Sequence, residues 1–296
     1  MKKLLVALLL SAGVLTVAQA QNVSLYGIVD GGVRYDGSAT SAGADRTKVL
    51  SGAQSTSRFG IKGSEDLGGG LTAKVQLESG ISIGNGATSQ QSASGSVLFD
   101  RLAYVAFGSQ VGEIALGRNT NAPFDFAAQG ITDPLAQALD GVSTPVGVNT
   151  NSTALRVNQT VNVVGSTNGF KTTRSDNQIK YVNTVSGITV VAGFAPGGVA
   201  GDNSAKSNYN LGVKGTFAGV TGAASTFRAQ DATSKDLTVN SIGATTTVGK
   251  LTGTVGYSTV KTDVGYAPSN LTTVATATTL LGGVSGVDGK VATVGA

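Results

Sequence analysis

The chain has 296 residues, with 43 glycines, 5 prolines and no cysteine, histidine or tryptophan. These counts exclude disulfides, thiolate chemistry and a Ser-His-Asp arrangement. Charged residues make up 13% and the formal net charge is +4, a weak positive balance that does not indicate a nucleic-acid-binding protein.

The first twenty residues have the pattern of a secretory signal peptide. Lys2 and Lys3 precede an apolar run from Leu4 to Val17, and Ala18-Gln19-Ala20 forms a small-x-small cleavage site. The run is shorter than the roughly 20 residues that a membrane-spanning helix needs. We therefore predict that the protein is exported and that residues 1–20 are removed.

A first strand is predicted from Val23 to Tyr35, because apolar and polar residues alternate along it. If Ser24, Asp30 and Arg34 face inward, the residues that face outward are Val23, Leu25, Val29, Val33 and Tyr35.

The segment Ser57 to Gly80 predicts a hairpin whose turn lies at Glu65 to Gly70. Its first run has Phe59 and Ile61 on one face and Arg58, Lys62 and Ser64 on the other. Its second run sets Leu71, Ala73, Val75 and Leu77 against Thr72, Lys74, Gln76 and Glu78. A soluble sandwich and a membrane barrel both alternate in this way, so the hairpin alone leaves both architectures open.

Strand follows strand along most of the remaining chain, and no helical period is found outside the signal. Further strands are predicted at Val97 to Phe107, Gly112 to Arg118, Arg174 to Thr184, Ile188 to Ala195, Asn208 to Phe217, Val220 to Ala229, Leu237 to Val248 and Leu251 to Lys261. About twelve strands of near ten residues, alternating but weakly hydrophobic, are typical of an outer-membrane β-barrel.

Aromatic residues add weaker support for a barrel. The seven tyrosines are predicted mostly near strand ends or on apolar faces, as an interfacial girdle would require: Tyr26, Tyr35, Tyr104, Tyr181, Tyr209, Tyr257 and Tyr266. For any single one, the high strand propensity of tyrosine is an equally good explanation.

One segment, from Asn119 to about Lys171, interrupts the strands and is far longer than a hairpin connection. Loops beyond roughly 12 to 15 residues are usually functional or disordered. This loop contains Asp125, Asp133 and Asp140 and no basic residue before Arg156. Three arginines, Arg58, Arg101 and Arg174, are predicted near the strand ends around it.

The motifs LYGIVD, SRFGIKGSEDLGGGLTAKVQLESG, DRLAYVAFGSQVGEIALGRN and RSDNQIKY together resemble the general porins of Gram-negative bacteria, especially the beta-proteobacterial branch. The resemblance runs from Val23 to about Lys261. It implies an all-β, transmembrane antiparallel barrel of the sixteen-stranded type, formed by residues 21–296 and assembled as a homotrimer in outer-membrane lipid. It also implies that residues 119–171 form the third loop, which folds inward and narrows the pore.

The resemblance also suggests which residues form the constriction. Arg58, Arg101 and Arg174 match the arginines of one wall, and Asp133, with Asp125 on the same loop, faces them. The strand phases predict Arg34, Lys62, Lys74, Glu78 and Lys180 as further pore-lining residues. Two positions depart from the enteric porins, since Ile28 replaces a lysine and Gln137 replaces a loop acid. Arg118 shares the phase of Ile114 and Leu116, and is therefore expected in a subunit contact or the wall.

These residues predict passive diffusion of small hydrophilic solutes and ions. Arginines facing carboxylates across a narrow aqueous gap create a field that biases ion permeation. No catalysis is expected, and no metal or other cofactor, because His and Cys are absent and no calcium-loop motif occurs. The alternative is a secreted or surface-exposed, β-rich adhesin.

The C-terminal sequence KVATVGA lacks the terminal aromatic residue usual in the family. With about twelve strands in place of sixteen, the expectation from sequence is a truncated or incomplete barrel. A closed twelve-stranded barrel is the alternative.

The N-terminal motif gives a direct prediction: the mature protein begins at Gln21 and fractionates with the outer membrane. N-terminal sequencing of the purified outer-membrane fraction checks this. Recovery of Met1 from the inner-membrane fraction would contradict it.

Overall fold

The computed structural model describes residues 22–37, 43–52, 55–88, 97–127, 129–131, 174–263 and 288–295. The elements in these residues are β1 (Asn22–Ile28), β2 (Gly31–Asp36), β3 (Arg46–Ser51), β4 (Arg58–Gly68), β5 (Leu71–Gly80), β6 (Leu102–Ser109), β7 (Gly112–Thr120), α2 (Ala122–Ala127), β8 (Arg174–Val185), β9 (Ile188–Ala195), β10 (Asn208–Phe217), β11 (Val220–Gln230), β12 (Asp236–Val248), β13 (Leu251–Thr262) and β14 (Asp288–Gly295). Among them, no helix is long and apolar enough to cross a membrane.

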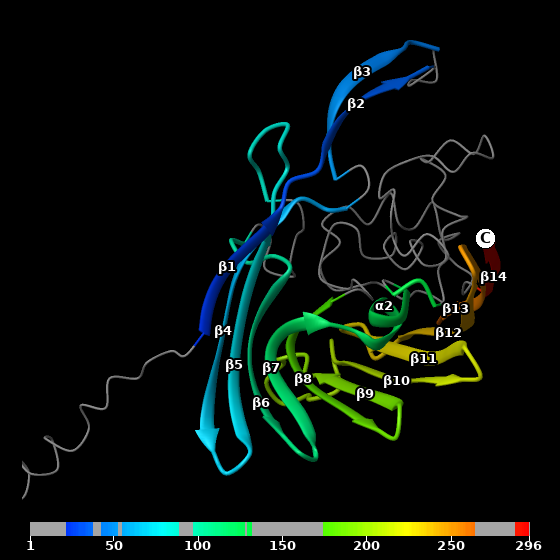
Figure 1. Ribbon diagram of the computed structural model, residues 1–296. Coiled ribbons are helices and arrows are strands. Elements are labelled where there is room, and N and C mark those ends of the chain that lie inside the picture. The colour runs from blue at the N-terminus through cyan, green and yellow to red at the C-terminus, as the bar shows by residue number, and fades with distance from the viewer. Residues whose placement is uncertain are drawn as a thin grey trace, which may run out of the picture.

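Twelve of the strands form one antiparallel sheet in the order β1-β4-β5-β6-β7-β8-β9-β10-β11-β12-β13-β14. Figure 1 shows this sheet curving around α2, with β4 to β7 on one side and β11 to β14 on the other. The remaining pair, β2 and β3, forms a hairpin that projects from the main sheet. Within the described residues, β1 and β14 are the two edge strands of the main sheet.

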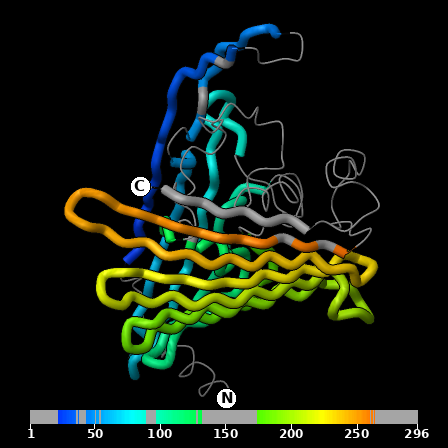
Figure 2. Tube along the Cα trace, turned by 90° about the vertical axis from the view of Figure 1, so that its right-hand side faces the viewer, coloured from blue at the N-terminus to red at the C-terminus, as the bar shows by residue number. Residues whose placement is uncertain are grey.

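Short turns join alternate strand pairs, as Figure 2 shows for the successive strands β9 to β13. Two of these turns have consecutive residues with positive φ, Ser186 and Gly187 (50° and 79°) and Ala218 and Gly219 (50° and 81°). Positive φ at both central residues is the geometry of the tight turns that match the twist of a hairpin. In an antiparallel sheet, the longer connections must then gather at the opposite end of the strands.

The two faces of the sheet differ in polarity. Residues paired across strands share a face, so the pairs Lys62–Gln76 and Ser64–Lys74 lie on one side and Ile61–Leu77 on the other. The exposed apolar side chains on the second, outer face include Leu25, Ile61, Val105, Ile114, Leu116, Ile179, Phe194, Leu211, Val213, Ile242 and Val255. On the first, inner face, Glu78, Gln178, Lys180 and Asn210 are buried. In a soluble protein most large apolar side chains are buried and most charged ones are exposed, so this sheet has the opposite arrangement.

The position of α2 identifies the inner face as the one enclosed by the curved sheet. A single row of paired residues crosses the strands and therefore shares a face: Lys74, Ala106, Ala115, Lys180, Gly193 and Asn210. Gly212 is on the same face as Asn210, and its missing side chain would point at Phe126 of α2. The helix consequently lies on the face that carries the charged residues.

Several sequence expectations agree with the structure and several do not. The Ser57 to Gly80 hairpin is confirmed, but its turn is shorter than expected, because β4 continues to Gly68 and only Gly69 and Gly70 form the turn. The single strand from Val23 to Tyr35 is wrong, because the chain leaves the main sheet after Ile28 and continues into the β2–β3 hairpin. The strand from Val97 starts only at Leu102. The short helix α2 was not expected.

Candidate functional site

Glu78 lies at the centre of a polar cluster on the inner face, which we call the Glu78 cluster: Tyr26, Arg58, Gln76, Glu78, Arg101 and Tyr104. Glu78 is only 5% exposed. Its Oε1 accepts a hydrogen bond from Arg101 Nε at 2.6 Å, and its Oε2 accepts one from the Tyr26 hydroxyl at 2.8 Å. Arg58 Nε lies 3.7 Å from Oε2, within ion-pair but beyond hydrogen-bond range. One buried carboxylate thus compensates two predicted constriction arginines.

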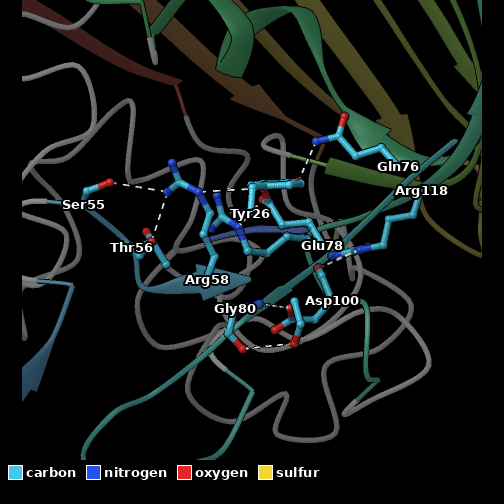
Figure 3. Close-up of polar contacts among 11 residues, drawn as sticks. Tyr26, Ser55, Thr56, Arg58, Gln76, Glu78, Gly80, Asp100 and Arg118 are labelled. Atoms are coloured by element: carbon cyan, nitrogen blue, oxygen red, sulfur yellow. Dashed lines mark hydrogen bonds and ion pairs between the residues drawn. The ribbon is translucent and has the colours of Figure 1, made fainter. Parts of the chain in front are cut away.

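Arg58 and Arg101 differ in accessibility. The Arg58 side chain is 24% exposed and that of Arg101 is 9% exposed. Arg58 Nη1 donates to the Thr56 carbonyl at 3.0 Å and to Ser55 Oγ at 3.4 Å, contacts that Figure 3 shows beside Glu78. Arg101 precedes β6, so its direction is not set by strand alternation, and its guanidinium reaches Glu78. Arg58 is therefore the more accessible of these two cations.

Arg174 is buried, at 3% exposure, with its guanidinium carbon 4.9 Å from the centre of the Phe124 ring. Unbroken alternation along Arg174 to Thr184 predicts that Arg174, Asp176, Gln178 and Lys180 share one face, and this prediction is wrong. Asn177 has a φ of 55°, and the β7–β8 register shifts beside it. As a result, Ser175 joins Gln178 on the inner face.

Asn121 anchors the start of the long loop to the inner face. Its Oδ1 accepts hydrogen bonds from Ser175 Oγ at 3.0 Å, from Gln178 Nε2 and from Asn210 Nδ2 at 3.1 Å. Asn210 Oδ1 in turn accepts a hydrogen bond from the Ala122 backbone N–H at 2.9 Å. All the side chains in this network are almost completely buried. Buried donors that share one acceptor fix the direction in which the chain leaves β7.

Apolar packing holds α2 against the same wall. Phe126 is 1% exposed and packs with Ala122, Ile131, Val191 and Ala223. A Cβ at Gly212 would lie 2.5 Å from Phe126 Cε2 and 2.8 Å from Ala122 Cβ. Only glycine at this position lets the helix approach so closely.

Polar contacts continue along the described part of the loop. Lys180 Nζ lies 2.7 Å from Asp125 Oδ2, Lys214 Nζ donates to Gln129 Oε1 at 2.6 Å, and Thr254 Oγ1 donates to the Gly130 carbonyl at 3.1 Å. The loop residues up to Ile131 therefore extend along the inner face from β8 towards β13.

The remaining predicted lining residues have mixed positions. Lys62 lies on the inner face with Nζ 5.5 Å from the centre of the Tyr26 ring, and Lys74 pairs with Glu113 at 2.6 Å. Arg34 is on β2, in the projecting hairpin, and so does not lie on the inner face of the main sheet. Asp133 lies outside the described residues, as do Gln137 and Asp140.

Arg118 and two of the tyrosines were expected at the outer wall or its aromatic girdle. Arg118 is buried, with Nε donating to the Asp100 carbonyl at 2.8 Å and Nη1 paired with Asp176. Tyr26 and Tyr104 share the inner face with Gln76, so they do not belong to an outer aromatic girdle. The tyrosines on the outer face include Tyr181, Tyr209 and Tyr257.

Cations outnumber carboxylates on the described inner face. The basic side chains are Arg58, Lys62, Lys74, Arg101, Arg174, Lys180 and Lys214, and the acidic ones are Asp66, Glu78, Asp100, Glu113 and Asp125. Among the described residues, no group of three or more acidic side chains could hold a metal ion. The absence of a cofactor stays a prediction.

A curved antiparallel sheet with an apolar outer face and a charged inner face defines the transmembrane barrel class. The sequence profile of the Gram-negative porin family matches residues 5–295, and the chain belongs to this family. The predicted all-β fold class and outer-membrane location are thereby confirmed.

Relatives and solved structures agree with this assignment. An outer membrane porin protein of Bordetella pertussis is 35% identical over 185 residues, covering 58% of this chain and 46% of the relative. Outer membrane porin protein 32 of Delftia acidovorans is 40% identical over 120 residues, covering 40% of this chain and 32% of the relative. The matched part of the chain thus spans less than half of each relative's length.

Among solved structures, the anion-selective porin from Comamonas acidovorans superposes with a TM-score of 0.60 at 25% identity, covering 82% of this chain and 69% of that one. Salmonella typhi OmpF gives a TM-score of 0.55 at 16% identity, covering 82% of this chain and 67% of that one. At 16% identity, the similarity to OmpF shows a shared fold and nothing about function.

Proposed function

We propose that the chain forms the wall of a water-filled channel for passive diffusion of small hydrophilic solutes and ions, and that it catalyses no reaction. The observation that carries this proposal is the inverted burial pattern, with exposed apolar side chains outside and buried charges inside. Charged side chains are tolerated inside a barrel when they border water, and not when they face lipid. A homotrimer is part of the proposal and rests on the family.

The experiment is to refold the chain, insert it into planar bilayers and record currents. A channel gives discrete conductance steps. A secreted adhesin, the alternative, gives none, and no described feature favours it.

We further propose that residues 119–171 narrow this channel and that Arg58, Arg101 and Arg174 form the basic side of the narrow part. Support comes from the described start of the loop, which packs on the inner face through Asn121 and Phe126. The excess of inner-face cations supports a preference for anions. The related Comamonas acidovorans protein is described as anion-selective.

This proposal predicts the effect of neutralising Arg58. Arg58→Gln removes the more accessible cation of the Glu78 cluster, so the anion-to-cation permeability ratio should fall about twofold or more. Reversal potentials under a salt gradient measure the ratio. Arg228→Gln is the matched control, because Arg228 pairs in register with Tyr209 on the outer face. Equal ratios for Arg58→Gln and the unmodified protein would remove Arg58 from the ion pathway.

A further inference from the structure

A directional chain of hydrogen bonds crosses the inner face and ends on Glu78. The Tyr104 hydroxyl donates to Gln76 Oε1 at 2.7 Å, and Gln76 Nε2 donates to the Tyr26 hydroxyl oxygen at 2.7 Å. The Tyr26 hydroxyl then donates to Glu78 Oε2 at 2.8 Å. Figure 3 shows Tyr26 between Gln76 and Glu78. The direction is fixed because the carboxylate only accepts and the Gln76 nitrogen only donates.

This chain determines how Glu78 divides its charge between two arginines. Oε1 is bonded to Arg101, and Oε2 is bonded to Tyr26. Arg58 Nε remains 3.7 Å from Oε2, and Arg58 Nη1 is bonded to the Thr56 carbonyl instead. Glu78 therefore pairs closely with the buried arginine and only loosely with the accessible one.

We propose that Tyr26 is a specificity-determining positioning residue of the ion pathway. Its hydroxyl donates to Glu78 Oε2 and so weakens the pull of this oxygen on Arg58, whose guanidinium stays available to anions in the lumen. The proposal rests on the channel function proposed above, but its structural part concerns only the state of Arg58.

Tyr26→Phe removes the hydroxyl and keeps the ring beside Lys62. Glu78 Oε2 then lacks its donor, and Arg58 Nε needs to move by only about 1 Å to form a charge-assisted hydrogen bond. Arg58 should be drawn onto Glu78, which lowers its reactivity and the anion preference of the pore. Glu78→Gln should have the opposite effect on anion preference, because it removes the negative charge from the cluster.

The double variant Tyr26→Phe with Glu78→Gln shows whether Tyr26 positions Arg58 through Glu78 or whether its replacement disturbs the local structure in general. If Tyr26 acts through Glu78, adding Tyr26→Phe to Glu78→Gln changes nothing further. Tyr104→Phe is the matched control, since it deletes an inner-face hydroxyl and leaves the Tyr26–Glu78 bond in place. Circular dichroism confirms that each variant keeps the strand content of the unmodified protein.

The decisive readout is labelling of arginine by phenylglyoxal in the detergent-folded full chain, followed by peptide mass spectrometry, with Arg228 as internal reference. Tyr26→Phe should slow the modification of Arg58 about threefold, Tyr104→Phe should not, and the double variant should match Glu78→Gln. Unchanged labelling in Tyr26→Phe, or slowing that persists in the double variant, overturns the proposal.

Reversal potentials give the second readout. Tyr26→Phe should shift selectivity towards cations by a smaller amount than Arg58→Gln. If the unmodified chain carries no current while Arg58 labelling responds as expected, the channel function fails and the positioning role stands. If currents appear but neither labelling nor selectivity responds, only the positioning role fails.

Discussion

Phe126→Ala is expected to lower the free energy of unfolding by about 3–5 kcal/mol, because Phe126 is the largest side chain between α2 and the inner wall. The ring is 1% exposed and packs against Ala122, Val191 and Ala223, so its removal leaves a cavity that the strands cannot close. Denaturant titration in detergent, followed by far-ultraviolet circular dichroism, measures the loss.

Phe217→Ala provides the control for this prediction. Phe217 ends β10 on the outer face and is 85% exposed, so its truncation should change the stability by less than about 1 kcal/mol. Losses of similar size in the two variants would show that α2 is not held by packing of Phe126.

Asn121→Ala is expected to have the second large effect, since one oxygen serves three buried side chains. Gln178 and Asn210 would lose their shared acceptor, whereas the Ser175 hydroxyl still has Asn208 Oδ1 at 2.8 Å, and a buried donor without a partner costs about 1–3 kcal/mol. We expect a loss of at least about 2 kcal/mol, together with faster hydrogen exchange at residues 121–127, because the base of the loop loosens.

Asn240→Ala is the matched control for this second prediction. Asn240 is exposed, and its amide makes a long hydrogen bond of 3.5 Å to Thr259 Oγ1. Its removal should change the stability by at most about 0.5 kcal/mol. If Asn121→Ala is equally mild, water replaces the lost acceptor and the network does not anchor the loop.

The strands could be predicted from sequence because the two faces of the sheet meet different surroundings. Ile188–Ala195 and Asn208–Phe217 agree with the predicted bounds at both ends. Asn208–Phe217 alternates between polar and apolar residues over most of its length, and both strands are bounded by glycine- or serine-containing turns. The inner-face positions of Lys62, Lys74 and Glu78 follow from the same period of two.

The errors arise where the period is broken. At Asn177 a positive φ shifts the phase of β8, so Ser175 and not Asp176 shares the face of Gln178. The Arg174 guanidinium nevertheless lies against Phe124 of α2. Alternation continues from β1 into β2 in the sequence, although the pairing partner changes from β4 to β3. Local pattern does not encode which strand is the partner.

The contacts that build the candidate site were harder to anticipate because they join distant segments. Asn121 and Asn210 are bonded across 89 residues. The six-residue α2 is too short for a helical period, and it is held by Phe126 packing over Gly212. Tyr26 could have been found from sequence, since it alternates with Leu25 and shares the face of Ser24.

The most direct test of the channel and its anion preference is the reversal potential of the unmodified, refolded chain in a planar bilayer under a potassium chloride gradient. We predict discrete conductance steps. Their reversal potential should be shifted from zero towards the equilibrium potential of chloride, because cations outnumber carboxylates on the inner face. The absence of steps would contradict the channel function, and a reversal potential on the potassium side would contradict the proposed role of Arg58 and its neighbours.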